Sequence, residues 1–319
     1  MKLFISITLL LFCCYNMMGQ QVPDTASVIG QLQYIYTLKD VISDHVWKDF
    51  GDKKNDVPLI YYDDSCCYVV NPSERILNQH TAKLVYKSKN INIYQTKRFD
   101  DIPFHMHVTF TDEENEIDFR TPIMRCSSLE QTSKTIPDVT TVKEWSTMVM
   151  HEYFHGFQFR QAGFLNAYEN IFSVCPKDTL ATIQARFEWY KESVQQENEL
   201  LLKAIGDVNI DDTKTHIRAF LEQRDKRRSK LKEEQNFDIT AAEQFMEITE
   251  GSARYIEYQL YDYFGDFNLA DAKWLYTTGK NYYYAIGFNM LRLLDKLGID
   301  YRSRIFTEPT AVEKILRKQ

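Results

Sequence analysis

The chain has 319 residues, 44% of them hydrophobic and 14% aromatic, and it carries a formal net charge of -7. This length and apolar content suffice to bury the core of one large domain or two small ones, which excludes a disordered chain. The acidic balance argues against a nucleic-acid-binding protein, because such proteins present a basic face to phosphates.

The first residues have the features of an export signal. Met1-Lys2 supply a positive charge, the apolar run from Leu3 to Tyr15 is too short to span a bilayer, and the small Gly19 follows. We therefore predict a signal peptide over residues 1–19, with a transmembrane anchor as the alternative. No asparagine begins an Asn-X-Ser/Thr acceptor, which favours a bacterial protein. The predicted location is the periplasm, the cell envelope or the medium, without a lipid anchor.

Four cysteines remain after the leader, namely Cys66, Cys67, Cys126 and Cys175. An even number of cysteines in an oxidising compartment predicts one or two disulfides, and the sequence leaves their pairing open.

The first part of the chain is predicted to form a helix and a small sheet. Apolar residues recur at steps of three and four from Val28 to Phe50, which indicates a helix. Short runs rich in Tyr, Val and Ile then alternate with clusters of Asp, Asn, Pro and Lys, which is typical of short strands and turns. The predicted strands lie at 59–62, 68–70, 91–94, 107–110 and 117–119.

Residues 141–160 are predicted to form a buried central helix. Thr141-Val142-Lys143-Glu144 fits a capping box, in which a hydroxyl and a carboxylate bond the unpaired amides of the first turn. Apolar residues surround most of the circumference up to about Arg160, so the helix should be buried and should form a rigid platform for a site.

A helical hairpin is predicted to follow. Apolar residues between 180 and 204 alternate at steps of three and four with one gap at Glu197, and a break at Gly206-Asp207 precedes a highly charged helix at about 214–235. The basic run 224–228 is interpreted as the solvated face of that helix.

The hairpin, residues 179–236, is interpreted as an insertion into a helical catalytic part that spans 141–319. Residues 20–140 would form the separate part with the N-terminal helix and the small sheet. The overall prediction is an α+β chain with a zincin-like catalytic domain.

Three more helices complete the predicted elements. The first runs from about Ile239 to Tyr263, the second runs from Tyr283 to Leu297 and is stopped by Gly298, and a short one follows Pro309. The first of them carries an apolar stripe and a charged stripe of Glu243, Glu247, Glu250, Arg254 and Glu257.

The most specific motif is His151-Glu152-Tyr153-Phe154-His155. His-Glu-X-X-His on a helix places both imidazoles on one face, close enough to bind one cation. Zinc with three protein ligands keeps a fourth position for water and lowers its pKa, so that Glu152 can act as general base. We predict His151 and His155 as zinc ligands and Glu152 as a catalytic residue.

Chance could also produce this motif. Its setting favours a real site, because two histidines and a glutamate on a buried helix would be costly without partners or a metal.

The segment 249–257 reads Thr-Glu-Gly-Ser-Ala-Arg-Tyr-Ile-Glu. It resembles the Asn-Glu-Gly-Phe-Ala-X-Tyr-X-Glu segment of the aminopeptidase N and leukotriene A4 hydrolase branch of the gluzincin metallopeptidases. A glutamate from a later helix completes the zinc site in that superfamily, so the resemblance implies Glu250 as the third ligand. Glu247 and Glu243 share its helix face and stay open as ligands or as partners of ligands, unless this stripe is a solvated surface.

Tyr284-Ala285-Ile286-Gly287 is similar to the Tyr-X-X-Gly segment of the same branch, whose tyrosine hydrogen-bonds the oxyanion of the tetrahedral intermediate. The resemblance implies that Tyr284 is catalytic, with Tyr282 and Tyr283 as competitors and a packing role as the alternative.

Two features depart from that branch. The interval from His155 to Glu250 is far longer, which the inserted hairpin would explain. The glycine-rich Met-Glu-Asn exopeptidase motif is absent, so the resemblance supports a peptidase better than an aminopeptidase.

His105-Met106-His107 would point both imidazoles to one face of a strand. A second metal site or a substrate-contacting edge would require such a pair, although a surface pair is the simpler interpretation.

Together these patterns predict an exported zinc metallopeptidase that hydrolyses peptide bonds, with substrate and cleavage position left open. A zinc hydrolase of a non-peptide amide or ester is one alternative. A non-catalytic envelope protein that keeps the metal and binds a protein partner through the hairpin is another. A purely structural zinc site, however, needs no base and normally has four protein ligands.

Overall fold

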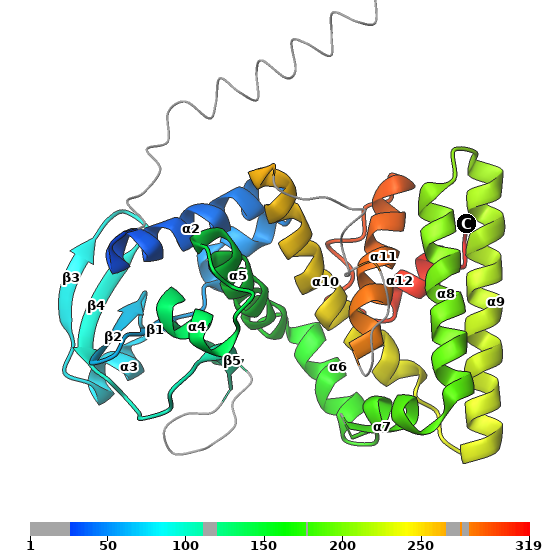
Figure 1. Ribbon diagram of the computed structural model, residues 1–319, viewed down its shortest axis with the longest axis horizontal. Helices are drawn as coiled ribbons and strands as arrows, with labels where there is room; N and C mark the ends of the chain where they lie inside the picture. Colours follow the sequence, from blue (N-terminus) through cyan, green and yellow to red (C-terminus); the bar gives the residue numbers. More distant parts are fainter. Residues whose placement is uncertain (1–25, 111–119, 177, 266–274, 276–280) are drawn as a thin grey trace, which may run out of the picture.

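The computed structural model describes residues 26–110, 120–176, 178–265, 275 and 281–319. It shows an α+β chain, as predicted, with a mixed sheet in one half and packed helices in the other (Figure 1). The predicted leader and the predicted strand at 117–119 lie outside the described residues, so export stays a prediction. None of the described helices has the length and hydropathy that a membrane span requires.

The sheet has the strand order β3-β4-β2-β1-β6-β5 among the described residues, and its only parallel pair there is β1–β6. Four strands correspond to predicted runs, whereas β3 and β6 were not predicted. The strands are β1 (Leu59–Tyr62), β2 (Cys66–Val70), β3 (Lys83–Lys87), β4 (Asn92–Lys97), β5 (Met106–Thr109) and β6 (Ile123–Ser127).

Both faces of the sheet are covered near its centre. Alternate residues such as Leu59 and Met124 join the main core with α2 (Val28–His45), while Ile60 and Ile123 face α3 (Glu74–Gln79) on the opposite side. Helix α2 confirms the predicted first helix, but it ends at His45. A 3₁₀ turn, Lys48–Gly51, replaces the last turn that was expected.

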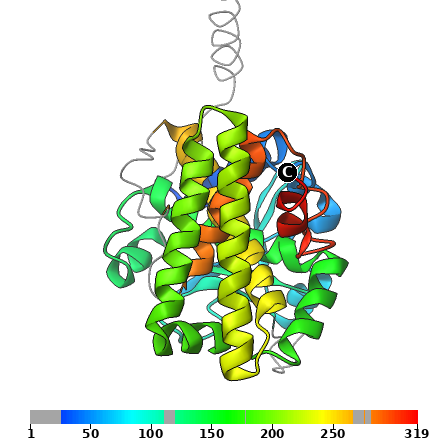
Figure 2. The same ribbon diagram turned by 90° about the vertical axis from the view of Figure 1, so that its right-hand side faces the viewer.

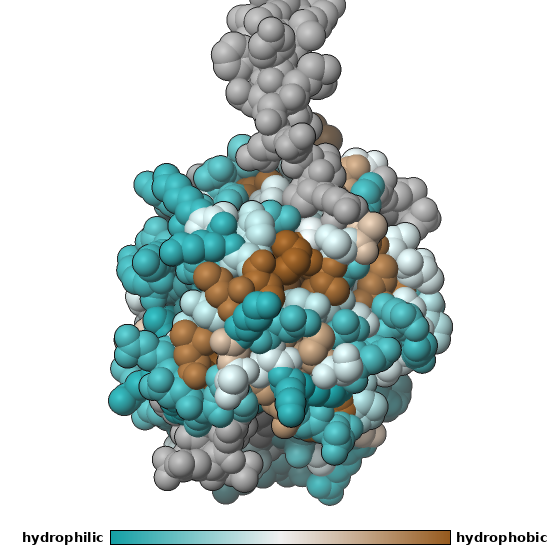
Figure 3. Space-filling model, turned by 90° about the vertical axis from the view of Figure 1, so that its left-hand side faces the viewer, coloured by the Kyte–Doolittle hydropathy of each residue, from teal (hydrophilic) through white to brown (hydrophobic). Residues whose placement is uncertain are grey.

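The edge strand β3 is protected by charge. Its side chains Leu84 and Val85 are 43% and 40% exposed, and Lys83 and Lys87 close the strand at both ends. Lysines at an edge strand discourage pairing with another chain. Figure 3 views the molecule from the sheet side and shows apolar patches surrounded by hydrophilic atoms.

Helix α5 (Val142–Phe159) occupies the centre of the molecule, and a short helix, α4 (Leu129–Thr135), precedes it. The predicted capping box is present, since the Thr141 hydroxyl accepts from the Glu144 amide and the Glu144 carboxylate accepts from the Thr141 amide. Trp145, Val149 and Phe154 are fully buried in the main core. The prediction of a buried, capped helix is confirmed.

The hairpin follows α6 (Ala162–Phe172) and consists of α8 (Glu188–Gly206) and α9 (Ile210–Gln235), which lie side by side in both views (Figures 1 and 2). The predicted first helix is split, because a separate α7 (Asp178–Arg186) ends before Phe187.

The basic run of α9 is not a solvated face, and this prediction was wrong. Arg224, Arg227 and Arg228 are 0%, 2% and 8% exposed. They bond four buried glutamates. The face of α9 that carries these arginines is therefore turned to the interior of the protein and not to solvent. We call this set the ion cluster, and its carboxylates are Glu197 of α8, Glu243 and Glu247 of α10 (Thr240–Phe264), and Glu313 of α12 (Ala311–Leu316).

The last helices are α10 (Thr240–Phe264), α11 (Tyr282–Lys296) and α12 (Ala311–Leu316), close to the predicted bounds. Gly298 has a φ of 66° and follows α11, as expected for a glycine that stops a helix.

The predicted disulfides are not formed. Cys66, Cys67, Cys126 and Cys175 are all free thiols. Burial raises the pKa of Cys67 to about 11, which keeps this thiol protonated at neutral pH.

Candidate metal centre

Three predicted ligands come together between α5 and α10. The Nε2 atoms of His151 and His155 lie 3.2 Å apart, and Glu250 Oε2 lies 3.6 Å from the first and 3.4 Å from the second. These three are the only described His, Cys, Asp or Glu residues that form a group able to hold a metal ion. The spacing follows from the i and i+4 positions on α5 and from the close packing of α10.

The outer ring nitrogens of both histidines are held by other side chains. His151 Nδ1 bonds the carboxylate of Glu257, and His155 Nδ1 lies 2.9 Å from Gln158 Oε1. The amide nitrogen of Gln158 donates to Thr249 O and Ser252 Oγ, so its oxygen must accept from His155. Both Nδ1 atoms therefore carry a proton, so in a neutral ring the lone pair of Nε2 points to the centre.

The donor set fits a zinc ion. Two imidazole nitrogens and one carboxylate oxygen are the ligands of catalytic zinc sites, which leave a fourth position open. Glu250 Oε2 is buried and accepts no hydrogen bond, although a buried carboxylate oxygen without a partner is costly. A cation between the three atoms would satisfy it.

The carboxylates at the centre favour positive charge between them, since Glu250 and Glu152 both raise the pKa of His155 against the opposing effect of burial. Burial raises the pKa of Glu250, but the neighbouring His155 and His151 outweigh this effect and hold the pKa well below its usual range. Glu250 is thus ionised, as a metal ligand must be, and a bound metal would replace the protons that the neighbouring carboxylates favour on the two imidazoles.

Glu152 shares a cavity with two of the ligands. This cavity of about 160 Å³ is lined by Glu152, His155 and Glu250 together with side chains of β5, α6 and α10. Burial raises the pKa of the Glu152 carboxyl, and the nearby histidines oppose that shift. A carboxyl with a raised pKa beside the ligands is suited to accept a proton from a water there.

Tyr284 lies beside His151, outside the lining of this cavity. Its ring stacks at 6.2 Å and 14° from the ring of His151, and Arg254 lies 4.9 Å above it. Burial and the charge of Glu250 raise the pKa of Tyr284 strongly, so its phenol keeps its proton. Of the competitors, Tyr282 is fully buried and donates to Glu243 instead.

Glu247 and Glu243 do not reach the metal centre. Both are completely buried, which excludes the solvated surface considered above, and both bond arginines of the ion cluster. Among the glutamates of the charged stripe, Glu250 alone points to the two histidines, whereas Glu257 contacts His151 from behind.

His105 and His107 have different environments. His105 is 1% exposed, stacks on Tyr62 and lies 3.0 Å from Asp100. His107 of β5 is exposed and lines the cavity next to His155. The two rings lie 5.6 Å apart, as expected for one face of a strand, but no third His, Cys, Asp or Glu among the described residues completes a metal group with them.

Sequence reasoning missed the role of Gln158 and the partnership of Glu257 with His151. Gln158 lies three residues after His155, where the two face each other on a helix. That spacing was the signal that could have revealed it.

Comparisons with family models, with curated proteins and with solved structures find no match to this chain.

Proposed function

We propose that this protein is a zinc-dependent peptidase whose metal is held by His151, His155 and Glu250. The observation that carries the proposal is the convergence of two imidazole Nε2 atoms and a buried carboxylate oxygen that accepts no hydrogen bond on one point. The position of Glu152 in the adjoining cavity favours a hydrolase over a structural metal clip, because a structural site has no need of a base. The likeness of two segments to gluzincins supports the same proposal.

In this proposal the bound zinc ion would polarise the scissile carbonyl and make the attacking water more acidic. Glu152 takes the proton of that water and delivers it to the leaving nitrogen. Tyr284 donates a hydrogen bond from its phenol to the carbonyl oxygen of the substrate, which gains negative charge during the attack. Glu257 and Gln158 keep His151 and His155 in the tautomer that the site requires.

The walls of the cavity favour a peptide as substrate. Phe110, Phe159 and Phe245 contribute apolar surface, and the edge strand β5 forms one side. Among the described residues β5 pairs with β6 only, so its outer edge can bond an extended peptide through the backbone. A pocket for a small ester would not need such an edge.

The test is metal analysis together with hydrolysis of a peptide library by the wild type, Glu152→Gln and Glu250→Ala. We expect near-stoichiometric zinc in the wild type and in Glu152→Gln, little zinc in Glu250→Ala, and hydrolysis by the wild type only. Hydrolysis by Glu152→Gln at the wild-type rate would overturn the mechanism. Full zinc in Glu250→Ala would overturn the ligand set, and turnover of esters without peptides would replace the substrate class.

A further inference from the structure

A second cavity lies on the face of the sheet that is turned away from the metal centre. It has a volume of about 190 Å³ and lies between α3, the start of β6 and Arg160, which caps the end of α5. Its floor contains Ile60 and Ile123, whereas the neighbouring Leu59 and Met124 point to the opposite face and join the core around α5. The sheet therefore separates this cavity from the metal centre.

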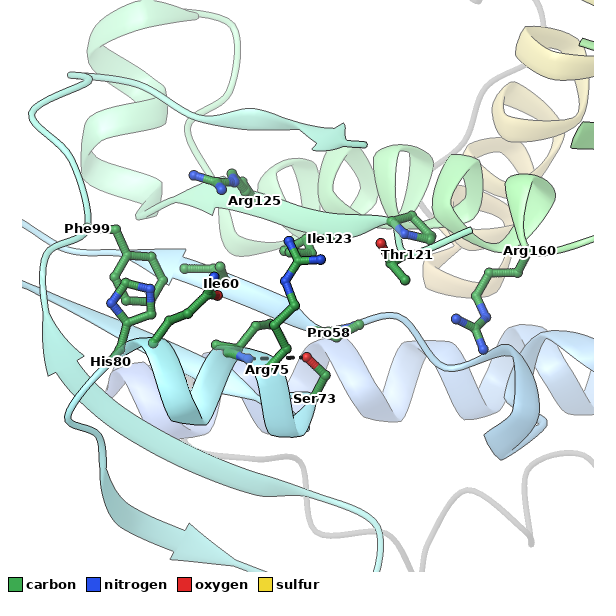
Figure 4. A pocket seen from close by; sticks show the side chains of 13 residues that line it. Pro58, Ile60, Ser73, Arg75, His80, Phe99, Thr121, Ile123, Arg125 and Arg160 are labelled. Atoms are coloured by element: carbon green, nitrogen blue, oxygen red, sulfur yellow. Dashed lines mark hydrogen bonds between the residues drawn. The ribbon is translucent and has the colours of Figure 1, made fainter. Parts of the chain in front are cut away.

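Three arginines from three parts of the chain surround an apolar floor in this cavity. Figure 4 shows Arg75 reaching from the start of α3 towards β6, with Arg125 and Arg160 to either side. The ring of Phe99 closes one end, where it stacks on His80 at 3.9 Å between ring centres. We call this site the arginine pocket, and its apolar lining consists of Pro58, Ile60, Ile76, Phe99, Pro122 and Ile123.

Arg125 and Arg160 differ in how their charge is balanced. Arg125 lies 3.4 Å from Asp100 and also donates to the hydroxyl of Tyr62. Arg160 donates to two backbone carbonyls, Lys54 O at 2.8 Å and Arg120 O at 3.4 Å, and it forms no ion pair within the described part of the chain. Its guanidinium is exposed and has no carboxylate partner among the described residues, so an anion from solvent can approach it.

An apolar floor with a positively charged rim selects an amphipathic anion. Guanidinium groups bind carboxylates through paired hydrogen bonds, and the floor removes an apolar group from water. A cavity of about 150 Å³ is known to hold one benzene ring. The arginine pocket therefore has room for one ring or a chain of about six carbons.

We propose that the arginine pocket binds a small organic carboxylate with an apolar body of this size. The apolar body lies on Ile60, Ile76 and Ile123, and the carboxylate contacts Arg160 and Arg75. The site is separate from the proposed metal centre and does not depend on its function.

The experiment uses NMR titration of the full-length protein with hexanoate and three related probes. Hexanamide keeps the shape and removes the charge, acetate keeps the charge and removes the apolar body, and hexylammonium reverses the charge. The variants are Arg75→Gln, Arg160→Gln and Gln79→Glu, which adds a carboxylate at the exposed end of α3 in the pocket lining. Arg218→Gln is the matched control, since Arg218 is exposed on α9 at the other end of the molecule.

We expect hexanoate to bind the wild type and Arg218→Gln equally, and to bind each of the three pocket variants more weakly, by about tenfold. Hexanamide and acetate should bind the wild type at least about tenfold more weakly than hexanoate. Gln79→Glu should improve the binding of hexylammonium. The proposal is overturned if hexanoate does not bind, if the amide binds as well as the acid, or if Arg160→Gln and Arg75→Gln bind hexanoate like the wild type.

Discussion

Gly251 and Gly287 bring α10 and α11 into backbone contact. A Cβ atom added at Gly251 would lie 2.5 Å from the carbonyl carbon of Gly287, and one added at Gly287 would lie 1.9 Å from the carbonyl oxygen of Glu247. Glu250 directly precedes the first glycine, and Tyr284 lies one turn before the second. The contact between the glycines therefore sets the distance between the proposed third ligand and the proposed oxyanion donor.

Gly287→Ala should destabilise the fold. Alanine is the better helix former by about 1 kcal/mol, but its methyl group has no room here, and overpacking costs about 1–3 kcal/mol. Urea denaturation should show a lower free energy of unfolding for this variant. Gly206→Ala is the control, because a Cβ atom at Gly206 meets nothing within 4 Å. Equal losses in both variants would contradict the role assigned to the contact.

Glu257→Gln should weaken metal binding without unfolding the protein. The carboxylate orients His151 and increases its basicity, and loss of such a partner typically costs about 10–100-fold in metal affinity. Competition with a chromophoric zinc chelator measures the effect. Asp262→Asn, an exposed acid on the same helix, should keep the wild-type affinity. An unchanged affinity in Glu257→Gln would show that His151 does not need this partner.

Tyr284→Phe should bind zinc like the wild type but hydrolyse peptides much more slowly. If the phenol donates to the oxyanion, its removal should lower kcat by about 10²–10³-fold with little change in KM. Tyr283→Phe is the matched control on the adjacent residue. Steady-state kinetics on one cleaved peptide separates the two, and a similar kcat for both variants would leave Tyr284 with a packing role only.

Glu247 should give the stability of the protein a distinctive pH dependence. Burial raises its pKa from 4.5 to about 7, with Arg224 opposing the shift, and the ion cluster holds one more carboxylate than guanidinium groups. The folded state keeps a proton that the unfolded chain releases above pH 4.5. This contribution to stability is therefore complete below that value and is lost as the pH rises through about 7.

Glu247→Gln should remove this dependence, because glutamine stays neutral. The free energy of unfolding of the wild type should fall relative to that of the variant between about pH 5 and pH 8, by at most about 1.4 kcal/mol per pH unit. Urea denaturation with a metal chelator present measures both curves. Glu222→Gln, an exposed change on α9, should run parallel to the wild type. Parallel curves for Glu247→Gln would contradict the assigned proton.

The sequence predicted best where local signals and long periodicity agreed. The capping box at Thr141 and the apolar repeat behind it located α5 within one residue of its end. The strands β3 and β6 escaped because Lys83–Lys87 has exposed apolar residues between lysines and Ile123–Ser127 follows a proline. Their pairing is a long-range property that short windows do not carry.

The ion cluster is a second feature that local sequence signals did not predict. A run with Arg224, Arg227 and Arg228 is normally solvated, because burying a charge is costly without a partner. The partners here lie on three other helices, and only the folded chain brings Glu197, Glu243 and Glu313 to them. The gap at Glu197 in the apolar seam of α8 was the one local sign of this arrangement.

The ion cluster also determines how the hairpin can move. Its charges come from α8, α9, α10 and α12, so lifting the hairpin would separate several buried ion pairs at once and disturb the helix that carries Glu250. Removing a single partner from such a buried pair already costs about 3–5 kcal/mol. The hairpin is therefore no independent arm: its inner amides should exchange with solvent only when the α10 region unfolds with it.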